Sequence, residues 1–241
     1  MKSNAEGEMP EWQIPTTWRS SQDLSNEGVI LYGNLVSPPC RKINTIFKYY
    51  GIKYDLQATI PAAVKAQYKK IPIVMVGAYQ INDSHIITRI LAHVLEGKDM
   101  NERELLIEKS TTQGLMPALE VAVLESTQSI QQCAPHLVEN CCLQGVIWSL
   151  ACCIPCCGIS SRIKKNFPDL KSVASYGKWF AEQLGDRPFF HGDQVGVIDC
   201  AVFGILEPFG EAGNACFDDF VNADPRLKTW WQTCVVQIAQ K

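Results

Sequence analysis

Ser37-Pro38-Pro39-Cys40 stands between an apolar run at residues 29–32 and a helical pattern that closes at Gly51. The run Val-Ile-Leu-Tyr is typical of a strand, and the apolar residues after Cys40 recur at helical spacing. Ser37 and Cys40 are therefore predicted at a helix N-terminus. Free backbone N–H groups and the positive end of the helix dipole stabilise a thiolate or a bound anion at such a position.

Two further markers follow this turn. A strand at residues 70–76 includes the Ile71-Pro72 bond near its start, and proline is tolerated at the first residue of a strand but not in the middle of a sheet. After a hairpin at Gly77, either Asp83 or Ser84 is the natural N-cap of an amphipathic helix.

The order of the elements predicts the fold of this half. Alternation at residues 52–56 indicates another strand, a short helix is expected around residues 58–68, and Gly97 ends the last helix. The resulting βαβ and ββα halves predict a thioredoxin-like α/β domain over residues 29–97.

The rest of the chain is organised around this domain. Residues 1–28 form a polar arm, which is either a disordered tail or an arm laid on a partner, since it carries Trp12 and Trp18. Charged residues 98–112 are the expected linker. Residues 113–241 lack strand alternation and predict an all-helical C-terminal domain.

Composition excludes several classes of protein. The chain has 241 residues, a formal net charge of −3 and no basic run, which excludes a nucleic-acid footprint. Eleven cysteines without a secretory segment predict reduced thiols in an intracellular, cytoplasmic or mitochondrial, compartment. The acidic opening 28 residues are unlike a mitochondrial import signal.

The thiol turn, the proline at the strand start and the Asp-Ser cap together resemble the N-terminal domain of the glutathione transferases. Within that superfamily the chain is most similar to the prostaglandin E synthase 2 family, and the loop and helix at residues 186–199 extend the resemblance into the C-terminal domain. Two departures weaken the expected site. Ser37 stands where that family has its reactive cysteine, and Asn34 stands where it has a tyrosine.

The resemblance implies roles for six residues. A cis bond before Pro72 would let the Ile71 backbone pair with the cysteinyl part of glutathione. Asp83 and Ser84 would hold its γ-glutamyl end.

Three alternatives stay open for the catalytic residues of the turn. Ser37 orients a glutathione thiolate, Cys40 is itself the nucleophile, or the turn is inactive. A serine cannot replace the cysteine in dithiol exchange.

Two functions follow from these alternatives. The first is a glutathione-dependent transferase or isomerase acting on a small electrophile or an endoperoxide. The second is a degenerate accessory subunit of a larger, mitochondrial, membrane-associated complex. Its partners would be bound through the N-terminal arm and through the uncharged stretch at residues 141–161, which is too diluted by polar residues for a convincing membrane span.

The remaining candidates are assigned to structure. Asp199, three residues after Gly196, is expected to cap a helix rather than to catalyse. The cysteines of residues 152–157 lack a matching second ligand pair, so no metal site is predicted. The four histidines, including His85 and His191, receive no chemistry. Haem, which the resemblance links to glutathione, is not expected without the first cysteine.

Overall fold

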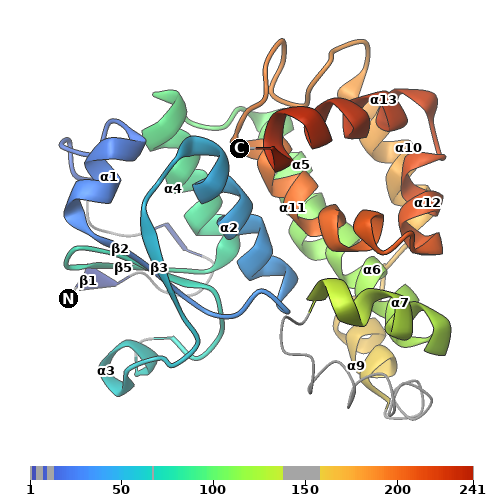
Figure 1. The fold of residues 1–241 in the computed structure, drawn as a ribbon, viewed down its shortest axis with the longest axis horizontal. Coiled ribbons are helices and arrows are strands. Elements are labelled where there is room, and N and C mark those ends of the chain that lie inside the picture. The colour runs from blue at the N-terminus through green and yellow to red at the C-terminus, as the bar shows by residue number, and fades with distance from the viewer. Residues whose placement is uncertain (1, 4–7, 10–13, 67, 138–157, 241) are drawn as a thin grey trace.

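The computed structural model describes the chain except for residues 1, 4–7, 10–13, 67, 138–157 and 241. A sheet with helices is followed by an all-helical half, and the two lie side by side (Figure 1). The predicted fold class, a thioredoxin-like domain followed by a helical domain, is confirmed.

The sheet has the mixed order that the sequence implies. Its strands are β2 (Val29–Tyr32), β3 (Tyr54–Gln57), β4 (Ile73–Val76) and β5 (Tyr79–Asn82), with the two-residue β1 (Lys2–Ser3) added at one edge. The order is β1-β5-β4-β2-β3, in which β2 is parallel to β3 and antiparallel to β4. The hairpin between β4 and β5 turns at Gly77, whose φ of 55° is readily reached by glycine.

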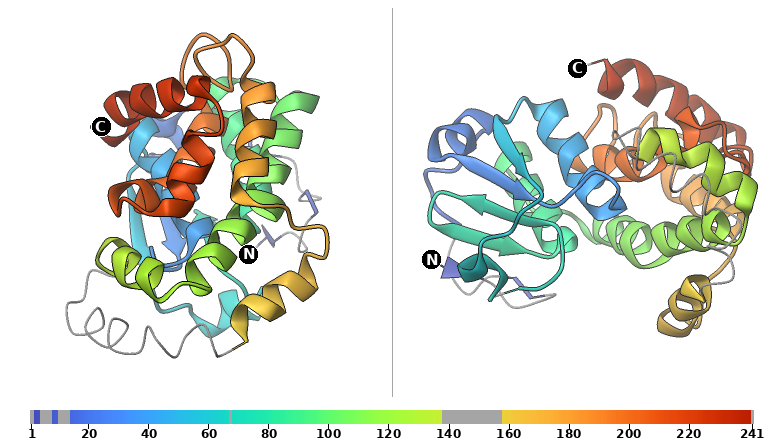
Figure 2. Two further views of the ribbon diagram at one scale, coloured as in Figure 1. Left: turned by 90° about the vertical axis from the view of Figure 1, so that its right-hand side faces the viewer. Right: turned by 60° about the horizontal axis from the view of Figure 1, so that its bottom comes forward.

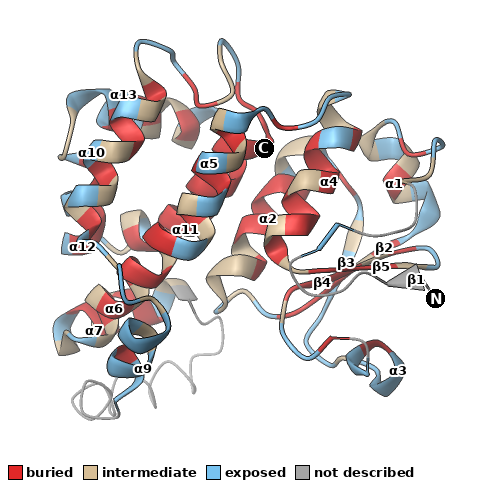
Figure 3. Cartoon of the chain, turned by 180° about the vertical axis from the view of Figure 1, so that it is seen from behind, coloured by how far each residue is buried: buried red, intermediate tan, exposed pale blue. Residues whose placement is uncertain are grey.

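Four helices complete the first domain: α1 (Ser21–Glu27), α2 (Pro38–Tyr50), α3 (Ala62–Lys65) and α4 (Ser84–Glu96). Helices α2 and α4 cover one face of the sheet, and α3 lies on the other side (Figures 1 and 3). Gly51 and Gly97 end α2 and α4 in the left-handed conformation, as predicted.

The second domain contains, in order, α5 (Glu102–Ser110), η1 (Thr111–Leu115), α6 (Met116–Leu124), α7 (Thr127–Leu137), α9 (Ile159–Asn166), α10 (Val173–Leu184), α11 (Val197–Glu211), α12 (Ala215–Val221), α13 (Pro225–Cys234) and η3 (Val235–Ala239). Figure 2 shows this bundle from two further sides. Helix α11 is apolar almost all round and is buried along most of its length.

The two domains meet where α11 packs against α2. A Cβ atom on Gly204 of α11 would lie 2.5 Å from Oγ1 of Thr45 and 3.2 Å from the carbonyl oxygen of Arg41. Gly204 therefore brings the two helices to near backbone contact, which fixes α2 against the helical domain.

The sequence-based domain boundaries remain predictions, but two of the segments have structure. Helix α5 occupies most of the expected linker, and its Glu104 and Glu108 are buried. Within the expected polar arm, Trp18 and Leu24 belong to the core, and β1 pairs with β5. These parts of the arm are thus bound to the chain's own first domain.

The uncharged stretch and the cysteine cluster lie largely outside the described residues. The structure describes only residues 158–161 of the first, and none of residues 152–157. Among the helices that the structure describes, none combines the length and apolar character needed to cross a membrane.

Candidate functional site

Strand register brings the three sequence markers to the same end of the neighbouring strands β2, β4 and β5. Tyr32, at the end of β2, pairs with Ile73 at the start of β4, and Ile73 pairs with Asn82 at the end of β5. The segments that immediately follow Tyr32, precede Ile73 and follow Asn82 must therefore emerge together. They carry Ser37, the Ile71-Pro72 bond and Asp83, which together we call the thiol corner.

Ser37 lies at the start of α2, as predicted. It is the N-cap residue, but its side chain makes no capping hydrogen bond, and the first two helical positions are prolines. The turn before it is held by a hydrogen bond from the Ser37 N–H to Oδ1 of Asn34 (3.2 Å) and by one from Arg41 Nε to the Leu35 carbonyl oxygen (2.6 Å). Arg41 also donates to the carbonyl oxygen of His136 in α7.

Cys40 lies beneath the turn and is completely buried. A Cβ atom on Gly33 would lie 2.4 Å from Sγ of Cys40, so the absent side chain of Gly33 makes room for the thiol. Burial raises the pKa of the Cys40 thiol and outweighs a hydrogen bond with the Ser37 side chain, which lowers it. A buried, protonated thiol is a poor nucleophile, so this arrangement argues against the predicted catalytic role of Cys40.

The Ile71-Pro72 peptide bond is cis, as the resemblance implied. Pro72 is buried and Ile71 is partly buried directly before β4. Ile71 also lies next to Gly33, since its Cβ is 3.6 Å from the position that a Cβ on Gly33 would take.

Asp83 and Ser84 begin α4. Asp83 is the N-cap residue, and its Oδ1 accepts from the His85 N–H at 2.9 Å. It is the one non-glycine residue with a positive φ (72°) among those described, while Ser84 is buried. The predicted cap is confirmed, and a ligand role for the pair stays a prediction.

A buried charged cluster connects the thiol corner with the second domain. Lys42 and Glu108 are both fully buried and form an ion pair, with Nζ 2.6 Å from Oε1. Glu108 also accepts from Thr112 Oγ1 at 2.9 Å and bonds Nδ1 of His85. Although burial alone raises it, Lys42 and His85 lower the pKa of Glu108 to about 2, so this carboxylate is ionised at neutral pH. Helices α2, α4 and α5 are thereby tied together beneath the corner.

Asp199 is structural, as expected. Its carboxylate accepts from the N–H groups of Phe190 (2.8 Å), His191 (3.0 Å) and Gly196 (3.2 Å), and from Trp230 Nε1 (2.9 Å). It is fully buried and holds the loop before α11 against α13.

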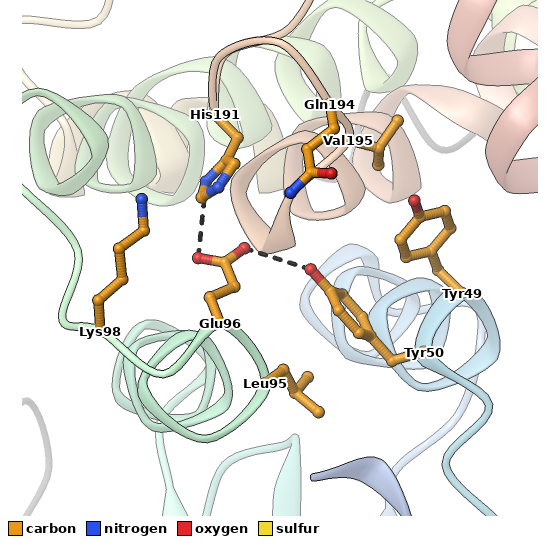
Figure 4. Close-up of a pocket in the computed structure, with 8 residues that line it drawn as sticks. All are labelled: Tyr49, Tyr50, Leu95, Glu96, Lys98, His191, Gln194 and Val195. Atoms are coloured by element: carbon orange, nitrogen blue, oxygen red, sulfur yellow. Dashed lines mark hydrogen bonds and ion pairs between the residues drawn. The ribbon is translucent and has the colours of Figure 1, made fainter. Parts of the chain in front are cut away.

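A second candidate site was missed by sequence reasoning. A cavity of about 600 Å³ lies at the opposite ends of α2 and α4 from the thiol corner, and Tyr49, Tyr50, Glu96, Lys98 and His191 are among its lining residues (Figure 4). The Glu96 carboxylate points toward both His191 and the Tyr50 hydroxyl (Figure 4). His191 is separated from Glu96 by 95 positions, so no local spacing could have indicated this pair.

Comparison with known proteins agrees with this architecture. Residues 166–232 match the family "Glutathione S-transferase, C-terminal domain". The chain is also 36% identical over 70 residues to glutathione S-transferase Mu 3 of Mus musculus. That segment covers 29% of this chain and 31% of the mouse protein, so the match spans about a third of the curated relative.

Solved structures show the same fold at low sequence identity. The apo form of glutathione S-transferase III aligns with a TM-score of 0.56 and 14% identity over 88% of this chain and 94% of its own. Glutathione transferase F7 from Populus trichocarpa aligns with a TM-score of 0.54 and 14% identity over 88% and 98%. A rice transferase in complex with glutathione aligns with a TM-score of 0.50 and 14% identity over 88% and 89%. The chain thus has the fold of the glutathione S-transferase superfamily, with a C-terminal domain of that type.

Proposed function

We propose that this protein binds glutathione at the thiol corner and acts as a glutathione-dependent transferase. The observation that carries the proposal is the strand register, which brings the segment of Ile71 and Pro72 to the same end of the sheet as the starts of α2 and α4. The rice structure of the same fold contains glutathione, which supports the choice of ligand.

Each end of the tripeptide has a counterpart at the corner. The positive end of the α4 dipole and the backbone N–H groups there that do not already donate to Asp83 suit the γ-glutamyl carboxylate, and Asp83 suits its ammonium group. The main chain of Ile71 pairs with the cysteinyl backbone. The Ser37 hydroxyl donates a hydrogen bond to the glutathione sulfur, for which the hydroxyl turns away from the Cys40 thiol.

The chemistry is stabilisation of a thiolate. The positive end of the α2 dipole and the Ser37 hydroxyl both favour the ionised sulfur, whose proton passes to solvent. The sulfur then forms a bond to a carbon of a small electrophile, and the leaving group, such as the halide of an aryl halide, departs from that carbon. In this role Ser37 lowers the pKa of the bound thiol, and Cys40 takes no part in the reaction.

Calorimetry with reduced glutathione tests binding, and turnover of an activated aryl halide tests catalysis. Asp83→Ala is expected to weaken glutathione binding by about tenfold or more, because a charged partner is lost. Ser37→Ala is expected to preserve binding and lower turnover about tenfold or more. Asp55→Asn, an exposed position on β3, is the matched control. Absence of glutathione binding at millimolar concentration refutes the proposal.

A second candidate is a non-catalytic member of the fold that serves as an accessory subunit of a larger assembly. It is favoured by the absence of an exposed sulfur at the described part of the thiol corner, since Ser37 has replaced the first cysteine and Cys40 is buried. A mitochondrial compartment and protein partners belong to this proposal. Glutathione binding without turnover of any electrophile, together with migration in a large complex on native gels, favours it over the transferase.

The likeness to the prostaglandin E synthase 2 family is kept as a finer proposal within the first candidate. Isomerisation of an endoperoxide would require the same bound thiolate but a substrate pocket shaped for a lipid. Turnover of a prostaglandin endoperoxide that exceeds turnover of the aryl halide supports this assignment, and the reverse ranking favours a general transferase.

A further inference from the structure

We infer that Glu96, Glu104 and His191 form a site for a divalent metal ion of the Mn²⁺ or Zn²⁺ class, at the end of the molecule opposite the thiol corner. One oxygen or nitrogen of each side chain lies within 4.8 Å of the others. The inference does not depend on glutathione binding, because none of these residues belongs to that corner.

The geometry around His191 suits metal ligation. Its Nδ1 atom lies 2.9 Å from Oε1 of Glu104 and 3.6 Å from Oε2 of Glu96. Carboxylate and imidazole ligands at about 2.0–2.2 Å around a tetrahedral ion are about 3.4 Å apart. Small side-chain movements are therefore enough to admit an ion between the three atoms.

Both carboxylates are already oriented by bonds through their other oxygen. Oε1 of Glu96 accepts from the Val197 N–H at 2.6 Å, and Oε2 of Glu104 accepts from the Asn101 N–H at 3.0 Å. Each carboxylate thus has one oxygen fixed by the backbone and the other directed at His191. Such outer bonds orient the ligands of metal sites and raise their affinity.

Burial supports a cation at this position. Glu104 is 1% exposed, Glu96 9% and His191 11%, so two carboxylates are held close together with little water. Helices α2 and α4 also end here with their negative dipole ends, at Tyr50 and Glu96. A divalent ion neutralises the two carboxylates.

Because Gly196 has no side chain, the His191 ring has room to lie beside the two carboxylates. A Cβ atom on Gly196 would lie 2.4 Å from Cγ and 2.7 Å from Nδ1 of His191, so any side chain there would displace the ring. The serine, threonine or asparagine that normally caps such a helix is therefore excluded by the imidazole that faces the two carboxylates.

The cavity provides the open coordination position. Glu96 and His191 both line the cavity of about 600 Å³ together with Tyr50, Lys98 and Gln194 (Figure 4). An ion bound by three protein ligands on its inner side would keep water or a small anionic ligand on the cavity side, as in three-ligand catalytic sites.

Manganese is the best probe because carboxylate and imidazole ligands bind it while thiolates prefer softer metals, which matters in a chain with eleven cysteines. The reduced full-length protein, freed of metals, is titrated with Mn²⁺ and the free ion is measured by electron paramagnetic resonance. One Mn²⁺ per chain is expected, displaced by Zn²⁺. Glu96→Gln, Glu104→Gln and His191→Gln are each expected to weaken binding about tenfold or more.

The controls are Glu102→Gln on the exposed side of α5 and His93→Gln on the exposed side of α4, which leave Mn²⁺ affinity unchanged. No bound Mn²⁺ in the parent, or equal loss in the ligand and control variants, overturns the inference. If the ligand variants fail to fold, diethyl pyrocarbonate modification of the parent decides it. Protection of His191 by Mn²⁺ is expected, and unchanged modification contradicts the site.

Discussion

Glu96 accepts a hydrogen bond from the backbone N–H of Val197, with 2.6 Å between Oε1 and N. Glu96 is the last residue of α4 in the thioredoxin-like domain, whereas Val197 is the first residue of α11 in the helical domain. Gly196 has no side chain that could cap α11. The Glu96 carboxylate, from the other domain, instead accepts one of the backbone hydrogen bonds of the first turn. Capping and domain association are therefore coupled through one residue.

Replacing Glu96 with alanine should lower the free energy of unfolding by about 1 kcal/mol, because the first turn of α11 loses an acceptor. Glu96→Gln keeps a carbonyl oxygen and should lose less. Urea unfolding of both variants measures the difference, and Glu102→Ala, at an exposed position of α5, is the control. Equal stability of the alanine and parent proteins would show that the bond contributes nothing.

Restoring a conventional cap with Gly196→Ser should destabilise the protein. The new Cβ would lie 2.5 Å from Cβ of His191, and this clash should outweigh a gain of a few tenths of a kcal/mol from the serine hydroxyl. In the His191→Gly background, which removes the Cβ as well as the ring, the same substitution should be neutral or stabilising. A double-mutant cycle by urea unfolding measures this coupling, and identical effects in both backgrounds would rule out the clash.

The fold could be predicted from sequence because its signals are local. Residues 29–32 and 84–96 combine the expected periodicity with caps and glycines close in sequence, and each forms the expected element. The strand expected over residues 70–76 also forms, but it begins only at Ile73, after the proline. The cis bond before Pro72 was predicted from the resemblance, since the Ile-Pro pair alone allows both isomers.

The candidate sites are formed by residues far apart in the sequence, so no local sequence pattern could predict their contacts. Lys42 and Glu108 are 66 positions apart, and a lysine on a helix is ordinarily solvated, so nothing in the sequence predicted a buried pair. Helix α5 could not be predicted for the same reason. Its charged sequence indicates a linker, but two of its glutamates are buried by residues that are distant in sequence.

Removing one member of the Lys42–Glu108 pair should strongly lower the free energy of unfolding. Glu108→Leu leaves the buried Lys42 ammonium without its carboxylate partner, which costs about 3–5 kcal/mol. Lys42→Met leaves Glu108 with His85 as its remaining partner and should cost less, and the double variant should cost clearly less than the sum of the two. Chemical unfolding of the four proteins measures the coupling energy. Simple additivity of the two effects would mean that the two charges do not depend on each other.

Acid should weaken the protein through the same carboxylate. The pKa of Glu108 is about 2 in the folded state against an ordinary value of 4.5, so between these values the unfolded chain binds more protons. Stability from Glu108 is therefore complete above about pH 4.5 and falls as the pH approaches 2. The gap corresponds to about 3 kcal/mol. Urea unfolding of the parent and of Glu108→Gln at pH 5, 4 and 3 tests this, with the parent losing more; parallel losses would contradict it.

Cys40 should resist alkylation in the folded protein. Its sulfur is fully buried beneath the Ser37 turn, and burial raises the pKa of the thiol, so both access and thiolate fraction are low. Iodoacetamide labelling followed by peptide mass spectrometry should modify Cys40 only in urea. Because α2 is also anchored through Lys42, Glu108→Gln should loosen the corner and accelerate labelling of Cys40 in native buffer. Rapid labelling of Cys40 in the native parent would instead show that this thiol is an accessible nucleophile. It would also argue against Ser37 as the residue that binds the glutathione sulfur.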